Sequence, residues 1–268
     1  MDWMDELATA RRVALLAGEA ILRQYARFTP VPDAPATITT DADRQAQDLI
    51  LELIAEEFPD DAFLAEEPTE ALGQLRREGR RLWVIDPIDG TRGFARKTDD
   101  FCTMVALAVD GVPVVGVVHE PVPGRTTWAV RGGGCLCKMV SEEAPRRVRV
   151  SSTAVAAQAT VVVSRGRQGR PPSPQEQYGV RNALFSFSCG TKMAMVARGE
   201  ADFYLSSAHA YSDWDLCAGH LLVEEAGGTV SDGQGGALIY GGASVTKDAG
   251  IIATNGRLHT AALQMLRR

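Results

Sequence analysis

The sequence lacks a long hydrophobic run. No apolar segment approaches the roughly 20 residues that a transmembrane helix needs. The N-terminal segment "MDWMDELATARRVALLAGEAILRQYARF" begins with acidic residues, and arginines interrupt its apolar stripe. This pattern is typical of an amphipathic helix and not of a secretory signal peptide, which has a basic start and an apolar centre. We therefore expect no membrane partner.

Positive charge and paired cysteines are also scarce. The chain has 28 basic and 34 acidic residues, a net charge of -6, which argues against a surface built for nucleic-acid backbones. The five cysteines are odd in number and scattered, and Cys135 and Cys137 have no second pair at zinc-finger spacing. We predict reduced thiols and a cytoplasmic protein.

The hydrophobic pattern predicts a different arrangement of helices and strands in each half of the chain. The first half reads as two helices followed by strands, including a hairpin at Asp110-Gly111. The second half alternates strands with helices, and residues 165–177 read as an exposed loop. The polar segment "SEEAPRRVRV" suggests a boundary between residues 1–145, an N-terminal α+β subdomain, and residues 146–268, a C-terminal α/β subdomain. Layered sheets and helices are expected, not a barrel.

The segment "WVIDPIDGTRGF" places Asp86 and Asp89 just after an apolar strand. Pro87 and Gly90 are expected to end that strand at Ile85. Closely spaced carboxylates repel one another when buried, unless a cation lies between them. This turn is therefore the strongest candidate for a metal site, and the Ile88 carbonyl could add a ligand.

Four more acidic side chains fall near the ends of predicted elements. Asp41 and Asp215 could instead be helix N-caps, and Glu66 and Glu67 could be solvated loop residues. Oxygen ligands without a histidine or cysteine cluster favour Mg²⁺ over zinc. Two or three such ions sharing carboxylates suit phosphoryl transfer to water. Backbone N–H groups after the turn could then hold the phosphate.

With these residues in place, nearly the whole chain resembles the inositol monophosphatase superfamily of Mg²⁺-dependent, lithium-sensitive phosphatases. The segments that carry the resemblance are "FLAEEP", "DPIDGTRGF", "VPVVGVVHEPV", "RGGGC" and "SDWDLCAGHLLVEEAGG". The resemblance implies a layered αβαβα sandwich (α+β or α/β in class) with the site between two subdomains. It also implies a phosphomonoesterase, and a homodimer, since relatives are commonly dimers.

The resemblance assigns roles to individual residues. The implied metal ligands are Glu66, Asp86, the Ile88 carbonyl, Asp89 and Asp215. Thr91 together with Asp41 would orient and activate the attacking water, and Glu67 would support that shell. The backbone of Gly90 and Thr91 would hold the phosphate.

The substrate is less constrained. Inositol enzymes usually have Thr-Asn-Phe after the signature glycine, whereas this chain has Thr91-Arg92-Gly93-Phe94. They also carry a Glu several residues before Trp-Asp, and in this chain Leu205 or Ser206 lies near the place of that Glu. A basic residue after the threonine is similar to the 3'(2'),5'-bisphosphate nucleotidases, which dephosphorylate 3'-phosphoadenosine 5'-phosphate. A second phosphate needs cations or N–H donors; the candidates are Arg92, Arg165, Arg167 and Lys192.

We therefore favour 3'-phosphoadenosine 5'-phosphate as the substrate, with three alternatives. One is inositol 1-phosphate. Another is histidinol phosphate or a further small phosphate ester, because related histidinol phosphatases also carry a basic residue after the threonine. The third belongs to a different class: a non-catalytic RNA- or transcription-associated protein, whose basic segments would be "APRRVRV" and "RGRQGR".

Overall fold

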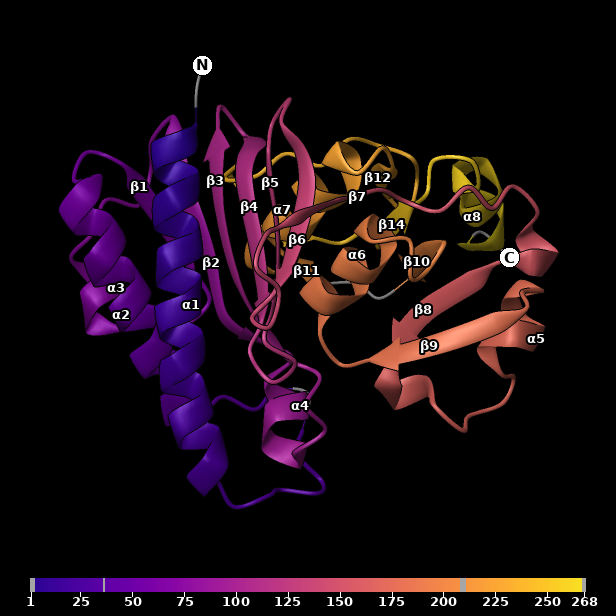
Figure 1. Cartoon of the computed structure of the whole chain (residues 1–268), viewed down its shortest axis with the longest axis horizontal. Helices are drawn as coiled ribbons and strands as arrows, with labels where there is room; N and C mark the ends of the chain where they lie inside the picture. Colours follow the sequence, from indigo (N-terminus) through magenta and orange to yellow (C-terminus); the bar gives the residue numbers. More distant parts are fainter. Residues whose placement is uncertain (1–2, 36, 208–210, 267–268) are drawn as a thin grey trace.

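Two β-sheets separate three layers of helices in the computed structural model of the chain (Figure 1). The structure describes residues 3–35, 37–207 and 211–266, and the side chain of Arg167 lies outside the described part. Across Figure 1 the layers run from α1 and α2, through a seven-stranded sheet, α6 and α7, and a five-stranded sheet, to α5 and α8. This arrangement confirms the predicted αβαβα sandwich.

The N-terminal helices and the seven-stranded sheet come first in the chain. The outer helices are α1 (Met4–Arg27), α2 (Asp41–Glu57) and the short α3 (Glu70–Gly73). The strands lie in chain order across the sheet: β1 (Ala62–Ala65), β2 (Arg81–Asp89), β3 (Cys102–Val109), β4 (Val112–Glu120), β5 (Arg125–Val130), β6 (Gly134–Met139) and β7 (Arg146–Val148). A short helix, α4 (Thr91–Arg96), leaves the end of β2.

The second sheet and its helices follow. The sheet has the order β12 (Thr229–Asp232), β14 (Ile251–Thr254), β10 (Phe203–Ser206), β8 (Thr160–Ser164) and β9 (Asn182–Ser186). The helices are α5 (Pro174–Tyr178), α6 (Cys189–Ala197), α7 (Asp213–Glu225) and α8 (His259–Leu266), with 3-10 turns η1 (Ala156–Gln158) and η2 (Arg165–Arg167). A two-stranded ladder joins β11 (Tyr211–Ser212) to β13 (Thr246–Lys247).

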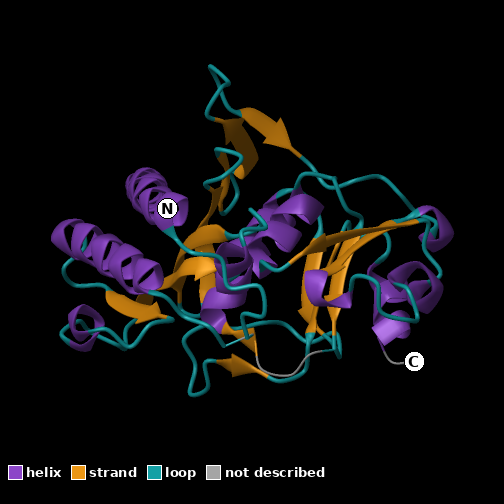
Figure 2. Cartoon of the chain, turned by 90° about the horizontal axis from the view of Figure 1, so that it is seen from below, coloured by secondary structure: helices purple, strands orange, loops and turns teal. Residues whose placement is uncertain are grey.

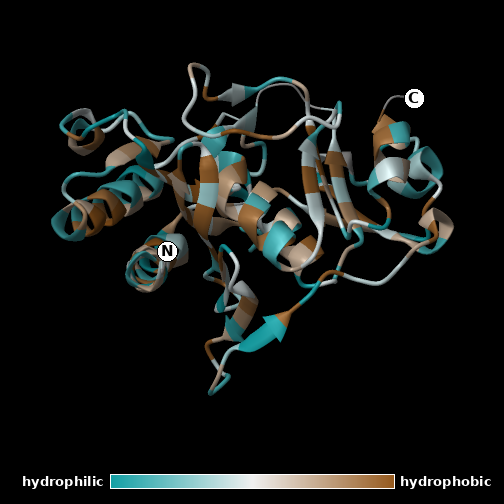
Figure 3. Cartoon of the chain, turned by 90° about the horizontal axis from the view of Figure 1, so that it is seen from above, coloured by the Kyte–Doolittle hydropathy of each residue, from teal (hydrophilic) through white to brown (hydrophobic). Residues whose placement is uncertain are grey.

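Three hydrophobic clusters hold these layers together. One lies between α1, α2 and the seven-stranded sheet, one between the two sheets around α6 and α7, and one between the five-stranded sheet and α8. The edge-on view in Figure 2 shows the layers, and Figure 3 shows hydrophobic segments in the helices between the sheets. Most residues of α6 and α7 are buried, so these two helices lie in the core and have no clear polar face.

The predicted hairpin is confirmed, but the end of β2 differs from prediction. Asp110 and Gly111 both have positive φ angles, as a two-residue primed turn requires. β2 does not end at Ile85; it continues to Asp89, with a register shift between Asp86 and Asp89. Pro87 lies within this irregularity, where the ladder needs no N–H donor from it, so the proline is tolerated inside the strand.

Other predictions need adjustment. The seven-stranded sheet includes β7 and so extends to Val148, beyond the predicted boundary at residue 145; we propose that the subdomains divide after Val148. The segment predicted as a loop at residues 165–177 contains η2 and most of α5. All five cysteines are buried free thiols. No described helix combines the length and hydropathy needed to cross a bilayer.

Candidate active site

A cavity of about 580 Å³ opens where β1, β2, α4 and α7 meet the segment before α2. This volume is typical of small-molecule sites. Its lining includes every predicted metal ligand and both predicted phosphate-binding residues: Glu66, Glu67, Asp86, Ile88, Asp89, Gly90, Thr91, Arg92 and Asp215, together with Ser164, Phe187 and Trp214. The fold therefore brings together acids that the sequence separates by up to 149 positions (215 − 66).

Three acids form a tight cluster in this cavity. Asp86, Asp89 and Asp215 each offer a carboxylate oxygen, and these oxygens lie within 4.8 Å of one another. The first two come from the irregular end of β2 and the third from the first turn of α7. Asp215 is not the N-cap of that helix; Ser212 is, and Asp215 completes its capping box by accepting from the Ser212 backbone N–H at 2.6 Å.

Burial makes the acids of the cavity hard to ionise. It raises the pKa of Asp215 to about 7 and of Glu66 to about 8, with further contributions from the charges of Asp89 and Asp215 respectively. The pKa of Asp86 is raised well above its ordinary value by burial and by the charge of Glu66. Mutual repulsion in a buried site therefore opposes full ionisation of the cluster.

The residues present fit a hard divalent cation. Asp86 Oδ1 is buried and has no hydrogen-bond partner among the described residues, so one acceptor in the cluster lacks a protein donor. Unpartnered buried acceptors are rare in folded proteins and call for an explanation such as an ion. The donor set is oxygen only, which is the chemistry that Mg²⁺ prefers. Glu66, Asp86, the Ile88 carbonyl, Asp89 and Asp215 are the residues that could hold it.

The side chain of Gln47 fixes the acidic pair that follows β1. β1 pairs in parallel with β2, with Ala65 opposite Ile85, so both strands lead acids toward the same edge of the sheet. Gln47 on α2 donates to the Glu67 carbonyl at 2.6 Å and accepts from the Glu67 N–H at 2.8 Å. The Glu67 carboxylate accepts a hydrogen bond from Thr39. The segment is therefore held in place by α2 and the residues before it.

Thr91 is paired with Asp43, not with Asp41. Thr91 Oγ1 lies 2.9 Å from both Asp43 Oδ1 and the Ile88 carbonyl oxygen. Asp43 is fully buried, and burial raises its pKa to about 6. The side chain of Asp41 is 84% exposed and pairs with Arg44 at 3.2 Å. The predicted role of Asp41 is therefore wrong: as the first residue of α2 it faces solvent, whereas Asp43, two positions on, is buried and contacts Thr91 behind the lining of the cavity.

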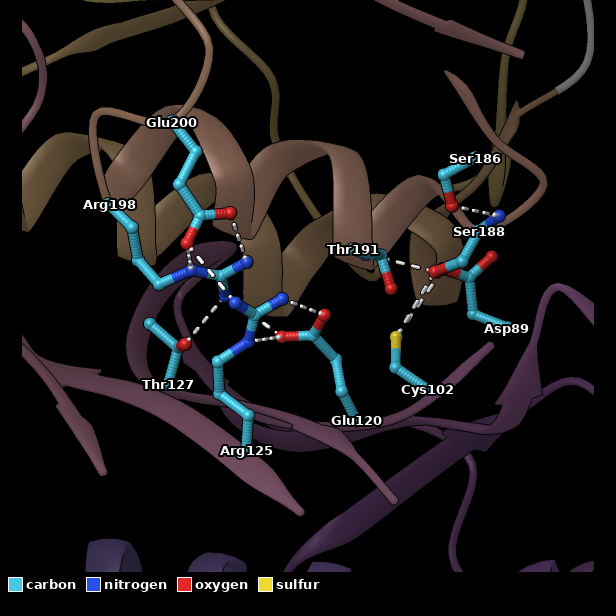
Figure 4. A network of polar contacts seen from close by, with 10 residues as sticks. All are labelled: Asp89, Cys102, Glu120, Arg125, Thr127, Ser186, Ser188, Thr191, Arg198 and Glu200. Carbon is cyan, nitrogen blue, oxygen red and sulfur yellow. Dashed lines mark hydrogen bonds and ion pairs between the residues drawn. The ribbon is translucent and has the colours of Figure 1, made fainter. Parts of the chain in front are cut away.

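Asp89 is held by the start of α6 (Figure 4). Its Oδ2 accepts from the Ser188 hydroxyl and from the Gly190 N–H, each at 2.5 Å, and its Oδ1 accepts from the Cys189 N–H at 3.1 Å. Burial raises the pKa of Asp89, while the Ser188 hydrogen bond and the charge of Lys192 oppose that shift. Asp89 is thus the acid of the cluster that the protein itself stabilises best.

A second, basic cavity of about 380 Å³ adjoins the acidic one. The two share Arg92 and Phe187, and the basic cavity is also lined by Arg96, Thr98, Arg165, Gly166, Gln168 and Arg170. Among the described residues, no carboxylate lies within 4.0 Å of the guanidinium nitrogens of Arg92, Arg96 or Arg170. Burial and the charges of Arg96 and Arg170 lower the pKa of Arg92, so this cavity holds uncompensated positive charge.

The other predicted cations have different environments. Arg165 lines the basic cavity, but its Nε donates to Asp100 at 2.8 Å, so part of its charge is already compensated. Lys192 is only 3% exposed and lies outside the lining of both cavities; its Nζ is 3.5 Å from the Ser186 and Phe187 carbonyl oxygens. The prediction that Lys192 contacts substrate is therefore wrong for this structure. Arg167 was also predicted, and its side chain lies outside the described part.

Three residues of the site escaped the sequence analysis: Asp43, Gln47 and Ser188. One signal was available, because Thr40 and Asp43 have the spacing of a capping box, and the structure contains that box. The box places the helix start at Asp41, which turns Asp43 inward. Neither Gln47 nor Ser188 carries a comparable local signal, since their partners lie 20 and 99 positions away.

Comparisons with known proteins show the family of the chain. The profile of the inositol monophosphatase family matches residues 3–268. The chain is 33% identical to a histidinol-phosphatase from Mycobacterium tuberculosis, over 99% of this chain and 97% of that one. It is 32% identical to the 3'(2'),5'-bisphosphate nucleotidase CysQ from Salmonella typhimurium, over 85% of this chain and 91% of that one.

The structure of an inositol monophosphatase from Anabaena superposes with a TM-score of 0.77 and 27% identity. The superposition covers 100% of this chain and 97% of the Anabaena chain. Similar proteins therefore carry three different substrate names.

Proposed function

The chain belongs to the inositol monophosphatase family, whose members hydrolyse phosphate monoesters, and we propose that its substrate is a small ester with a second anionic group, 3'-phosphoadenosine 5'-phosphate above all. Mg²⁺ dependence and lithium sensitivity are typical of this family. The observation that carries the substrate proposal is the basic cavity that shares Arg92 and Phe187 with the acidic one.

The proposed reaction uses two or three Mg²⁺ ions in the acidic cavity. When bound, they would neutralise the carboxylates and phosphoryl oxygens and make water a competent nucleophile at neutral pH. Glu66, Asp86, the Ile88 carbonyl, Asp89 and Asp215 are the proposed ligands. The chain's own contribution is to keep carboxylate oxygens of Asp86, Asp89 and Asp215 within 4.8 Å of one another, on β2 and α7.

Thr91 and Asp43 are proposed to orient the attacking water and take its proton. A threonine hydroxyl has one proton to donate and two lone pairs. With its proton directed to Asp43 Oδ1, the oxygen of Thr91 is left to accept a hydrogen bond from a water in the cavity. Asp43 is in turn fixed by the Thr40 N–H at 2.9 Å and the Thr40 hydroxyl at 2.6 Å. Glu67 is proposed to support this shell.

The neighbouring cavity is proposed to hold the second phosphate. A dianion there would meet Arg92, Arg96 and Arg170, none of which has a carboxylate partner among the described residues. Guanidinium groups bind phosphate through paired N–H donors. Phe187 lines both cavities, with the Arg92 guanidinium 5.3 Å from its ring centroid, and offers a face for the adenine ring. Inositol 1-phosphate has no second anion to use these arginines.

Phosphate release should be measured with Mg²⁺ for a panel that isolates the second anion. 3'-Phosphoadenosine 5'-phosphate and adenosine 3'-phosphate differ only in the 5'-phosphate, and inositol 1-phosphate and histidinol phosphate complete the panel. We expect kcat/KM for the bisphosphate to exceed the others by at least about tenfold, roughly 1.4 kcal/mol of transition-state binding. If inositol 1-phosphate or histidinol phosphate is preferred, the substrate proposal fails.

Matched arginine variants locate the effect. Arg170→Ala should raise KM for the bisphosphate and leave adenosine 3'-phosphate unchanged. Arg181→Ala removes an exposed arginine outside the lining of both cavities and should change neither. Equal losses on both nucleotides in Arg170→Ala would refute the second-phosphate role.

The remaining expectations stay predictions. Homodimer formation and a cytoplasmic location are among them. The rival reading, a non-catalytic RNA-associated protein, predicts salt-sensitive RNA binding that survives Asp89→Asn. The enzymatic reading predicts that the same variant loses hydrolysis.

A further inference from the structure

The first turn of α6 closes directly onto the carboxylate of Asp89. Ser188, Cys189 and Gly190 supply one hydroxyl and two backbone N–H donors to it. A carboxylate has about four acceptor positions, two on each oxygen. Ser188 and Gly190 donate to Oδ2, where the Cys102 thiol is a further, weak donor at 3.6 Å, and Cys189 donates to Oδ1. A single strong acceptor position, on Oδ1, is left for a cation.

The Ser188 hydroxyl performs two tasks at once. It donates to Asp89 and accepts from the Thr191 N–H at 2.9 Å, which makes it the N-cap of α6. Cys102 Sγ lies 3.3 Å from the same hydroxyl and 3.6 Å from Asp89 Oδ2. Ser188 is fully buried, so water does not replace its donor. The Ser188 hydroxyl therefore acts beside the two backbone N–H donors of Cys189 and Gly190 in orienting the Asp89 carboxylate, and of these three donors it is the one that a side-chain substitution can remove.

The other end of α6 is anchored to the seven-stranded sheet. Arg198 follows the helix, and its side chain is fully buried. Its Nη1 lies 2.9 Å from both Glu120 Oε2 and Thr127 Oγ1, and Arg125 pairs with Glu120 at 2.7 Å (Figure 4). The helix is thus fixed at both ends by contacts within the chain, and its donors are directed toward Asp89.

We propose that Ser188 is a positioning residue that fixes Asp89 and thereby sets the affinity of the acidic cluster for its divalent cation. The inference rests on the proposed role of Asp89 as a metal ligand. Hydrogen-bond partners of metal ligands typically change metal affinity or activity by 10- to 100-fold when removed. Ser188 contributes through Asp89 and is not expected to touch the substrate.

Calorimetric titration of the full chain with Mg²⁺ tests this directly. Ser188→Ala should raise the Kd for Mg²⁺ by about tenfold or more. Ser188→Thr keeps the hydroxyl and should restore most of the affinity. The matched control is Ser173→Ala, which removes the N-cap of α5, where the Ser173 hydroxyl accepts from the Glu176 backbone N–H at 3.2 Å and does not contact the cluster. The control should lower the melting temperature and leave the Kd for Mg²⁺ unchanged.

The outcomes separate this inference from the proposed function. A wild-type chain that binds no Mg²⁺ overturns both. A wild-type chain that binds Mg²⁺ while Ser188→Ala binds within twofold of it overturns the positioning role alone. If Ser188→Ala does not fold, Ser188→Cys supplies the same readout, because a thiol of similar size is a weak donor and should give an intermediate Kd.

Discussion

Thr91 Oγ1 lies 2.9 Å from Asp43 Oδ1, across 48 positions of sequence. The contact joins Thr91, the first residue of α4, to Asp43 in the first turn of α2. It forms because α2 packs along β2, the strand that leads into α4. The pair is therefore a product of packing between layers and not of any local motif.

The first prediction concerns this pair. Thr91→Ala and Asp43→Asn should each lower kcat by about 100-fold or more, with smaller changes in KM, because both groups act on the attacking water. Asp41→Asn is the control: its carboxylate is exposed, and its kcat should stay within about twofold of wild type. Steady-state kinetics at saturating Mg²⁺ decides. A large loss in Asp41→Asn would return the role to that residue.

The second prediction concerns the metal-free cluster. Asp86→Asn should stabilise the protein in chelator at pH 8 by about 1 to 2 kcal/mol, because it removes a buried, unpartnered acid from among its neighbours. Asp89→Asn should not stabilise it, since the start of α6 already compensates that carboxylate. Urea unfolding measures both.

The raised pKa values of the acidic cluster determine whether the metal-free protein gains or loses stability as the pH rises. Groups whose folded pKa is raised contribute stability below the unfolded pKa and lose it as pH rises through the folded value. Because the pKa of Glu66 is raised to about 8 and that of Asp215 to about 7, the metal-free wild type should lose stability as the pH rises from about 4 to 8. Asp86→Asn should flatten this decline. An unchanged slope would contradict the repulsion account.

The third prediction concerns the ion pairs around Arg198. Glu120→Gln should cost about 3 kcal/mol, because it leaves Arg198 and Arg125 with one partner fewer in a buried site. Asp110→Asn breaks the exposed pair with Arg80 while keeping a residue that tolerates a positive φ, and no measurable loss is expected. Comparable losses in the two variants would show that burial is not what makes the Arg198 network matter.

The fourth prediction concerns His119 on β4. Burial lowers its pKa to about 4, and its Nδ1 lies 2.9 Å from Thr126 Oγ1. Because the folded pKa lies below the unfolded value of 6.5, the unfolded chain takes the proton first, and stability is lost as pH falls from about 6.5 to 4. The loss is on the order of 3 kcal/mol.

Urea unfolding of His119→Gln checks this. The variant should lose less stability than wild type over the same pH interval. His259→Gln serves as control, because His259 is only half buried and its pKa, though lowered, should produce a smaller difference. If the two variants show the same pH dependence as wild type, burial of His119 does not govern acid sensitivity.

Local patterns were enough wherever a property depends on neighbours in the chain. The Asp110-Gly111 turn predicted a hairpin, and in the structure β3 ends at Val109 and β4 begins at Val112, on either side of that turn. The acidic motifs predicted a metal site, and their residues do line one cavity. The error at Asp41 has a physical origin. Residues two apart at a helix start point in different directions, and the orientation of α2 on β2 decides which one faces inward.

The sequence alone therefore determined the family, the layered fold and the acids that gather at the ends of strands and helices, because these depend on hydrophobic periodicity, turn residues and short motifs. The tertiary structure decided the partners. Asp43 meets Thr91, Ser188 meets Asp89, and Arg96 and Arg170 meet around Phe187 only because separate layers pack together. Contacts between distant segments are set by packing and burial, which no local pattern encodes.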